Sequence, residues 1–233
     1  MKEVIQRLEQ RTAEFAQSPL FTFLRDKSLD PKKRLGFAPS VAHFVMSFAD
    51  LYSFVLQVHP AEDEYQELVN AHAQEDAEHW RWFLDDLDKL GFDEQVRFSD
   101  ALRFVWGKPT ERTRALTYKM CQLGYGASSL EKLVLVHVIE AAGKVTVDGV
   151  SAVGTEFWKQ TGKKLVYMGH HHLATESEHT LEKQDVHRGI EAIEVPAIER
   201  PRLLAMVDEG FAAFAAFTND MLETARAERR LAS

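Results

Sequence analysis

A chain of 233 residues, of which 45% are hydrophobic, can bury a large core, and this excludes a wholly disordered protein. Its 28 basic and 36 acidic residues give a net charge of −8 without a long run of either sign, so neither nucleic acid nor a membrane is expected as a partner. The only cysteine is Cys121, which excludes an internal disulfide and favours a reducing cytoplasm. Residues 1–16 lack the apolar stretch of a signal peptide, and no apolar run reaches the roughly 18 residues of a membrane span.

Helical periodicity runs through nearly the whole chain, which predicts an all-α fold. The first helix is expected over residues 2–16, and Asp30 followed by Pro31 is typical of an N-cap and a first helical position. The breaks at Pro and Gly are short, so we expect a single domain over residues 1–233. Further helices are predicted over residues 40–59, 61–90, 110–123, 128–147, 151–161, 168–183 and 200–229.

The predicted helix over residues 61–90 carries a narrow stripe of His72, Glu75 and His79. At about 100° per residue, these three positions fall within about 60° of one another. Such a stripe on its own is most often a solvated helix face. Here His79 is surrounded in sequence by aromatic and aliphatic residues such as Trp80 and Phe83, which favours a buried position.

A second stripe, formed by His172, Glu176 and His179, has i, i+4, i+7 spacing in the predicted helix over residues 168–183. Imidazole nitrogens and carboxylate oxygens together suit iron, manganese or zinc, whereas the lack of thiolates argues against a structural zinc site. Two such stripes in one chain point to a metal centre between helices.

Glu140 lies in the middle of a helix that is apolar almost all round between Leu133 and Val147, as expected for a central helix. Burying a carboxylate without a partner costs several kcal/mol or neutralises it. The partner is either a metal ion or a basic residue such as Arg114. We interpret His137, one turn before Glu140, as a core or outer-sphere histidine rather than a direct ligand.

Taken together, these motifs resemble those of the haem-oxygenase-like diiron oxidases and oxygenases. The match consists of a ligand pair that ends in His79, the lone Glu140, and the H-x3-E-x2-H string that begins at His172. The segment SPLFTFLRDKSLDPKKRLGFAPSVAHF is also similar to the opening of that superfamily. The resemblance implies a single seven-helix haem-oxygenase-like bundle with a carboxylate-bridged diiron site.

The resemblance also implies a set of metal ligands. Several relatives have a carboxylate where this chain has His72, and others use a shorter spacing that selects Glu75. We expect Glu75, because a second carboxylate better neutralises two ferrous ions, and His72 remains the alternative. Glu176 stands where relatives often have Asp. The implied ligands are Glu75, His79, Glu140, His172, Glu176 and His179.

The implied cofactors are two Fe(II) ions, with O₂ as co-substrate and a peroxo-diferric intermediate. The implied reactions on a small, amino-acid-derived substrate are N-oxygenation, desaturation, decarboxylation or C–C cleavage, including nitrile formation. No catalytic residue beyond the ligands is predicted. An aromatic amino acid is one candidate substrate, and an external electron donor and a homodimer are further candidate partners.

Four other functions are alternatives. A ferritin-like diiron protein uses two Glu-x-x-His motifs, of which Glu176 and His179 supply one. A true haem oxygenase needs a histidine nearer the N-terminus than His43. A metal-free thiaminase-like hydrolase would use Cys121 as its nucleophile, and a non-catalytic binding protein would need none of these groups.

Overall fold

The computed structural model describes residues 1–75, 78–176 and 189–231, and all regular structure within these ranges is helical. The predicted all-α fold is therefore confirmed for the described part of the chain. Three short elements of other helical type occur, the 3₁₀-helices η1 (Ala38–Val41) and η3 (Lys108–Thr110) and the π-helical turn η2 (Tyr52–Leu56). The α-helices are α1 (Lys2–Phe15), α2 (Pro19–Leu24), α3 (Pro31–Arg34), α4 (Ala42–Leu51), α5 (Glu64–Glu75), α6 (His79–Leu90), α7 (Phe98–Val105), α8 (Glu111–Gly124), α9 (Ser129–Thr161), α10 (His170–Glu176) and α12 (Arg200–Leu231).

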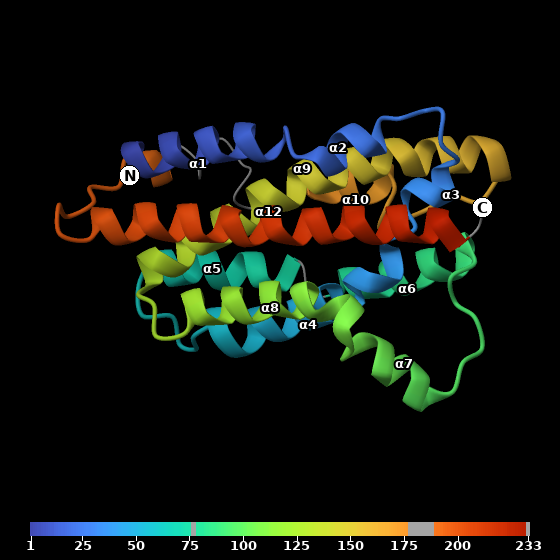
Figure 1. Cartoon of the computed structure of the whole chain (residues 1–233). Helices are drawn as coiled ribbons and strands as arrows, with labels where there is room; N and C mark the ends of the chain where they lie inside the picture. The colour runs from blue at the N-terminus through green and yellow to red at the C-terminus, as the bar shows by residue number, and fades with distance from the viewer. Residues whose placement is uncertain (76–77, 177–188, 232–233) are drawn as a thin grey trace.

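The bundle is built around its two longest helices, α9 and α12. In Figure 1, α12 crosses the middle of the molecule, and it contacts α1, α8 and α9. Helix α9 contacts α1, α5, α10 and α12, so other helices cover it on several sides. This position explains why the sequence around Glu140 is apolar almost all round the helix.

Helix α9 is continuous over Ser129–Thr161, so the prediction of two helices with a break between residues 147 and 151 is wrong. Two glycines of this helix lie where other elements approach its backbone closely. A Cβ atom on Gly154 would lie 1.9 Å from the carbonyl oxygen of Met168, and one on Gly149 would lie 3.1 Å from the ring of Phe21. At the N-terminus of the helix, Ser128 and Glu131 form a capping box.

Residues 61–90 form two helices, α5 and α6, rather than the single helix that was predicted. Helix α6 spans His79–Leu90 and is followed by Gly91, whose φ of 68° gives a left-handed C-cap. Residues 76 and 77, between the two helices, lie outside the described residues, and Glu78 is the N-cap of α6.

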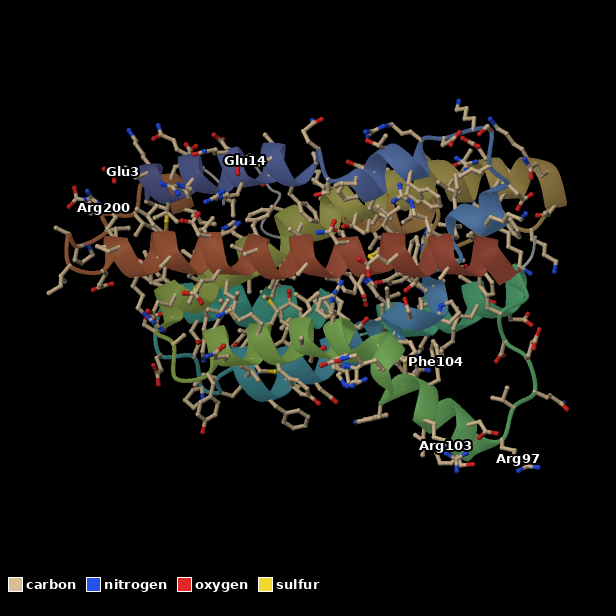
Figure 2. All side chains as sticks on the ribbon, in the orientation of Figure 1. Glu3, Glu14, Arg97, Arg103, Phe104 and Arg200 are labelled. Carbon is tan, nitrogen blue, oxygen red and sulfur yellow. The ribbon has the colours of Figure 1, made fainter. Side chains whose placement is uncertain are left out.

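Other boundaries differ more modestly from those predicted. Residues 40–59 form the end of η1, then α4 and η2. Helix α10 covers His170–Glu176, and residues 177–183 of the predicted helix lie outside the described residues. Helices α2 and α7 were not predicted. Helix α7 has no buried residue and lies at the edge of the bundle, near the labels for Arg103 and Phe104 in Figure 2.

The stretch Pro31–Leu56 is more apolar than the sequence analysis allowed, with a mean hydropathy of 1.2 over its best window. By length and composition it qualifies as a candidate membrane span on an averaged scale, which is a different criterion from an uninterrupted apolar run of about 18 residues. Core helices of soluble proteins pass the same test. Within the bundle, this stretch contributes α4, which contacts α8.

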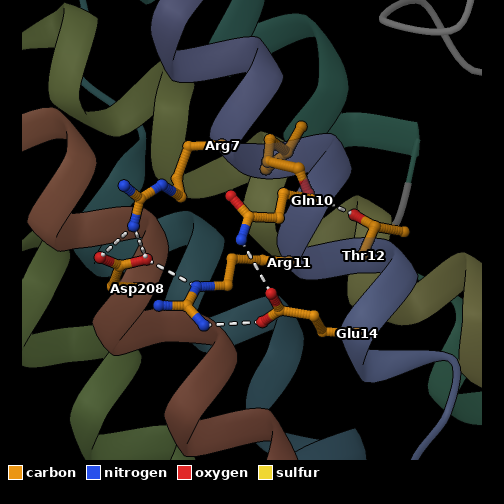
Figure 3. Close-up of polar contacts among 7 residues, drawn as sticks. Arg7, Gln10, Arg11, Thr12, Glu14 and Asp208 are labelled. Carbon is orange, nitrogen blue, oxygen red and sulfur yellow. Dashed lines mark hydrogen bonds and ion pairs between the residues drawn. The ribbon is translucent and has the colours of Figure 1, made fainter.

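The first and last helices are joined by an ion-pair cluster centred on Asp208 of α12 (Figure 3). Arg7 Nη1 lies 3.0 Å from Asp208 Oδ2, and Arg11 Nε lies 2.7 Å from Oδ1. Arg11 also contacts Glu14 Oε2 at 2.7 Å. Near the start of the same two helices, Arg200 Nη1 lies 3.1 Å from Glu3 Oε1 (Figure 2). These contacts hold α1 along α12.

Candidate metal centre

A cavity of about 80 Å³ brings together residues from five helices, α4, α6, α9, α10 and α12, and from the segment before α10. Three of the predicted ligands, His79 of α6, Glu140 of α9 and His172 of α10, line it. The other residues of its wall are mainly aromatic and aliphatic, and they are Phe44, Val45, Phe48, Ala49, Trp80, Ile139, Gly143, Val147, Tyr167 and Phe214. Imidazole and carboxylate groups from segments far apart in the chain therefore meet at one largely apolar space.

Glu140 is almost completely buried, with 12% of its side chain exposed, and its Oε1 lies 2.9 Å from Nε2 of His72. His72 is completely buried on α5. The guanidinium of Arg114, the basic partner considered above, is engaged elsewhere, because its Nη1 donates to the carbonyl oxygens of Val105 and Gly107 at 2.7 and 3.0 Å. The partner that the structure shows for the buried carboxylate is thus an imidazole.

His172 is held in a fixed orientation by the backbone. Its Nδ1 lies 2.8 Å from the carbonyl oxygen of Tyr167. A carbonyl can only accept a hydrogen bond, so Nδ1 carries a proton and Nε2 carries the lone pair of the neutral ring. Metal-binding histidines typically have this arrangement, in which one nitrogen is held by a carbonyl or carboxylate and the other binds the metal.

His79 is the first residue of α6 and is buried, with 7% of its surface exposed. Its ring stacks on Trp82 at a centroid distance of 4.4 Å, and its centroid lies 4.9 Å from that of His172. One residue of each predicted stripe, His79 and His172, therefore lies beside the other in the described part of the chain.

Three of the predicted ligands lie partly or wholly outside the described structure. Glu75 and Glu176 are the last residues of α5 and α10, and their side chains are not described, whereas His179 lies entirely outside the described residues. Among the side chains that are described, no three His, Cys, Asp or Glu residues are already arranged to hold one metal ion. His79, Glu140 and His172 do line one cavity, and His72 lies beside Glu140.

Asp86 is a buried carboxylate near the centre that the sequence analysis missed. It is completely buried on α6, and its two oxygens accept hydrogen bonds from the N–H groups of Val166 and Met168 at 2.7 and 2.8 Å. Burial raises the pKa of Asp86, and the two hydrogen bonds act in the opposite direction. Asp86 follows His79 by seven residues and thus shares its helix face, a spacing that could have revealed it.

The side chains required by the alternative functions lie elsewhere. Cys121 of α8 is half-buried, burial raises the pKa of its thiol, and it does not line the cavity. His43 Nδ1 lies 3.2 Å from Thr117 Oγ1, and burial lowers the pKa of its ring. His137 is partly buried one turn before Glu140 on α9.

Sequence comparison does not assign the chain to a family. No protein-family model matches it, and no curated protein is significantly similar to it in sequence. A functional assignment therefore depends on the chemistry of the cavity and the side chains that line it.

Proposed function

We propose that this protein is an O₂-dependent non-haem diiron oxidase or oxygenase of the haem-oxygenase-like superfamily, with the seven-helix bundle of that superfamily as its core. The observation that carries the proposal is that three ligands predicted from sequence, His79, Glu140 and His172, line one largely apolar cavity although they come from three different helices. The proposed substrate is small and derived from an amino acid.

The chemistry of the donor set fits iron. Imidazole nitrogen and carboxylate oxygen are the ligands of many non-haem iron sites. Glu140 is a buried carboxylate that needs cationic partners, and the fixed Nδ1 of His172 directs the lone pair of that ring to Nε2. These two residues and His79 would hold the iron ions, together with the remaining predicted ligands Glu75, Glu176 and His179.

His72 supports a modified ligand set. The sequence analysis preferred Glu75 to His72 as the sixth ligand, on grounds of charge. The contact of 2.9 Å between His72 Nε2 and Glu140 Oε1 favours a role for His72 within the centre, either as a ligand or as the group that orients Glu140.

When bound, two ferrous ions would supply the electrons with which O₂ is reduced. The residues of this chain provide the surroundings for that chemistry. The apolar wall, with Phe44, Phe48 and Ile139, excludes water and packs against the substrate. The Tyr167 carbonyl fixes the orientation of the His172 ring. A ligand that does not rotate keeps the metal position constant relative to a substrate bound against the cavity wall.

The proposal is tested by iron binding. Purified protein loaded anaerobically with Fe(II) should retain about two iron ions per chain by elemental analysis, as a two-metal site requires. His172→Ala should lower this content, whereas His170→Ala is a matched control, because His170 lies in the same His-His-His run but is exposed. The proposal would be contradicted if the wild-type protein retained less than about half an equivalent of iron and Glu140→Ala retained the same amount.

The reaction is tested by oxygen consumption. Among a panel of amino acids, at least one should trigger O₂ uptake by the iron-loaded protein, and His172→Ala should abolish this uptake. Cys121→Ser should leave the uptake unchanged, because Cys121 is away from the cavity. Thiamine cleavage by metal-free protein that Cys121→Ser abolishes would instead identify a thiaminase-like hydrolase.

A further inference from the structure

Trp82 adjoins the candidate metal centre without lining the cavity. It follows His79 by three residues on α6, so the two side chains are neighbours on one helix face. Their rings are stacked, with 4.4 Å between the centroids and 22° between the planes. The indole also lies 5.9 Å from the ring of His172, measured between centroids. One indole therefore touches both of the histidines that line the cavity.

The same indole extends to the protein surface. Trp82 is partly exposed, whereas His79 and His172 are buried. The ring of His171, an exposed residue, meets the indole edge to face at a centroid distance of 5.0 Å. A single aromatic ring thus connects two buried imidazoles with the solvent.

Two tyrosines also contact histidines near the centre, but their positions differ from that of Trp82. Tyr52 packs on His72 at a centroid distance of 5.8 Å and is only 1% exposed. Tyr167 packs on His172 at 4.6 Å and lines the cavity itself. Among the described residues, Trp82 therefore combines stacking on a predicted ligand with partial exposure and a place outside the cavity lining.

The chemistry of the proposed function gives such a ring a use. Reduction of O₂ at iron consumes electrons, and a soluble donor has to replace those that the substrate does not supply. The donor cannot reach buried ligands directly. Indole is among the side chains that lose an electron most readily, and contact between stacked rings favours electron transfer from one to the next.

We propose that Trp82 passes electrons, one at a time, from a soluble one-electron donor of the ascorbate type to the iron ions held by His79 and His172. In each transfer, the oxidised centre takes one electron from the indole, and the indole N–H proton leaves to water. The donor then returns one electron, and a proton from water restores the N–H group. Overall, the donor is oxidised, the centre is reduced, and no bond to carbon forms or breaks. The inference rests on the proposed function, because it needs bound iron.

Without a donor, oxidation should mark Trp82. Protein loaded anaerobically with Fe(II) and then exposed to O₂, with neither substrate nor donor, leaves the indole radical unreduced, so that the radical combines with O₂. Peptide mass spectrometry should then find oxygenated Trp82 and much less oxidation of Trp80, although Trp80 lines the cavity. Ascorbate added before O₂ should suppress the modification. Equal oxidation of the two tryptophans, or the same oxidation of Trp82 in iron-free protein, would overturn the proposal.

The variant Trp82→Phe separates electron transfer from packing. Phenylalanine keeps a ring that can stack on His79 but loses an electron far less readily, so the iron content should match that of the wild type. Ascorbate, followed by its ultraviolet absorbance after O₂ is added, should be consumed several-fold more slowly. Trp158→Phe is the matched control, because Trp158 is exposed and lies about 27 Å beyond Glu140 along α9, at about 1.5 Å per residue. Consumption at the wild-type rate by iron-loaded Trp82→Phe would refute the role of Trp82.

The two proposals fail in different measurements. Wild-type protein that retains no iron by elemental analysis would reject both the diiron centre and the electron route. Protein that retains about two iron ions per chain, but in which Trp82 stays unmodified after O₂ exposure without a donor, would reject the electron route alone. The diiron centre would then remain the proposed function.

Discussion

Asp86 and His172 are linked through the short backbone segment between α9 and α10. Asp86 accepts hydrogen bonds from the N–H groups of Val166 and Met168, and the carbonyl oxygen of the residue between them, Tyr167, accepts one from His172 Nδ1. A carboxylate on the helix that begins with His79 therefore fixes the orientation of an imidazole on another helix. The two halves of the centre are connected without a direct contact between Asp86 and His172.

Replacement of Asp86 should destabilise the protein and loosen His172. Asp86→Ala leaves the N–H groups of Val166 and Met168 without this acceptor, and at about 1–3 kcal/mol each the free energy of unfolding should fall by roughly 2–6 kcal/mol. Urea denaturation measures this change, and ¹⁵N NMR of the His172 ring should show that Nδ1–H has lost its fixed tautomer. The control is Asp85→Asn at the exposed neighbouring position, which should change stability by less than about 0.5 kcal/mol. An unaltered His172 signal in Asp86→Ala would contradict the link.

The pKa of Asp86 has a consequence for stability that can be measured. Burial raises this pKa above its ordinary value of 3.8, so in the window above pH 3.8 the folded protein binds more protons at this group than the unfolded chain. Stability contributed by Asp86 therefore falls as the pH rises through that window. The free energy of unfolding of the wild type, relative to that of Asp86→Asn, should rise as the pH is lowered towards 3.8. If the difference between the two proteins were the same at every pH in this window, the prediction would be wrong.

The ion pair between Arg34 and Glu156 should contribute stability with the opposite dependence on pH. Arg34 is 1% exposed, and it pairs with Glu156 and donates to the Leu24 carbonyl oxygen at 2.7 Å. The hydrogen bond from Arg34 lowers the pKa of Glu156 below 4.5. The contribution is thus present above pH 4.5 and is lost as the pH falls through the lower pKa of the folded state.

Glu156→Gln should therefore lower the free energy of unfolding at neutral pH by about 1.5–3 kcal/mol, the value of a charged hydrogen bond. At a pH below the pKa of the folded state, the variant and the wild type should differ much less. Glu209→Gln is a control, because Glu209 is half exposed in its pair with Lys119 and should contribute about 0–1 kcal/mol. If the free energy of unfolding fell equally in Glu156→Gln and Glu209→Gln, the burial of Arg34 would not strengthen its ion pair.

The same substitution at two glycines of α9 should have opposite effects. Gly143→Ala should raise stability by up to about 1 kcal/mol, because alanine favours the helix and its Cβ meets no atom of the described residues within 4 Å. Gly154→Ala should lower it by about 3 kcal/mol or more, because its Cβ would lie 1.9 Å from the carbonyl oxygen of Met168. Thermal unfolding gives the melting temperature of each variant, and a change of the same sign in both would contradict the prediction.

Removal of the N-terminal cap of α9 should have a smaller effect. Ser128→Ala removes the side-chain oxygen that accepts from the Glu131 N–H and should cost about 1 kcal/mol. Ser128→Asp retains an acceptor and should keep most of the stability. Denaturation midpoints that fall equally in both variants would show that capping is not the cause.

Much of the helical architecture, and part of the centre, could be predicted from the sequence. Glu140 was identifiable because a carboxylate in a run of aliphatic residues contradicts its surroundings and demands a partner. The hydrogen bond between His172 and the Tyr167 carbonyl could not be predicted, because every residue has a backbone carbonyl and the side chain of the acceptor residue gives no indication of it. The separate start of α6 at His79 was hidden for a related reason, since the N-cap position is Glu78, which is not one of the residue types that usually cap a helix.

The space beside Gly143 also could not be predicted. A glycine in a helix reads as a weak break or a packing site, and only the positions of the surrounding elements show that, among the described residues, no atom lies within 4 Å of a Cβ built on Gly143. Asp86 shows the same limit, because its partners lie 80 and 82 residues further along the chain. Sequence periodicity reports the face of a helix but not the element that it meets.

Phe214, near the middle of α12, is the last residue in chain order to line the cavity. During synthesis on the ribosome, the helices that carry His79, Glu140 and His172 emerge before this wall exists. The cavity therefore lacks one wall until α12 has been made. A chain that ends before Phe214 would expose buried imidazole and carboxylate groups, so a cavity shielded from water depends on α12 packing over it.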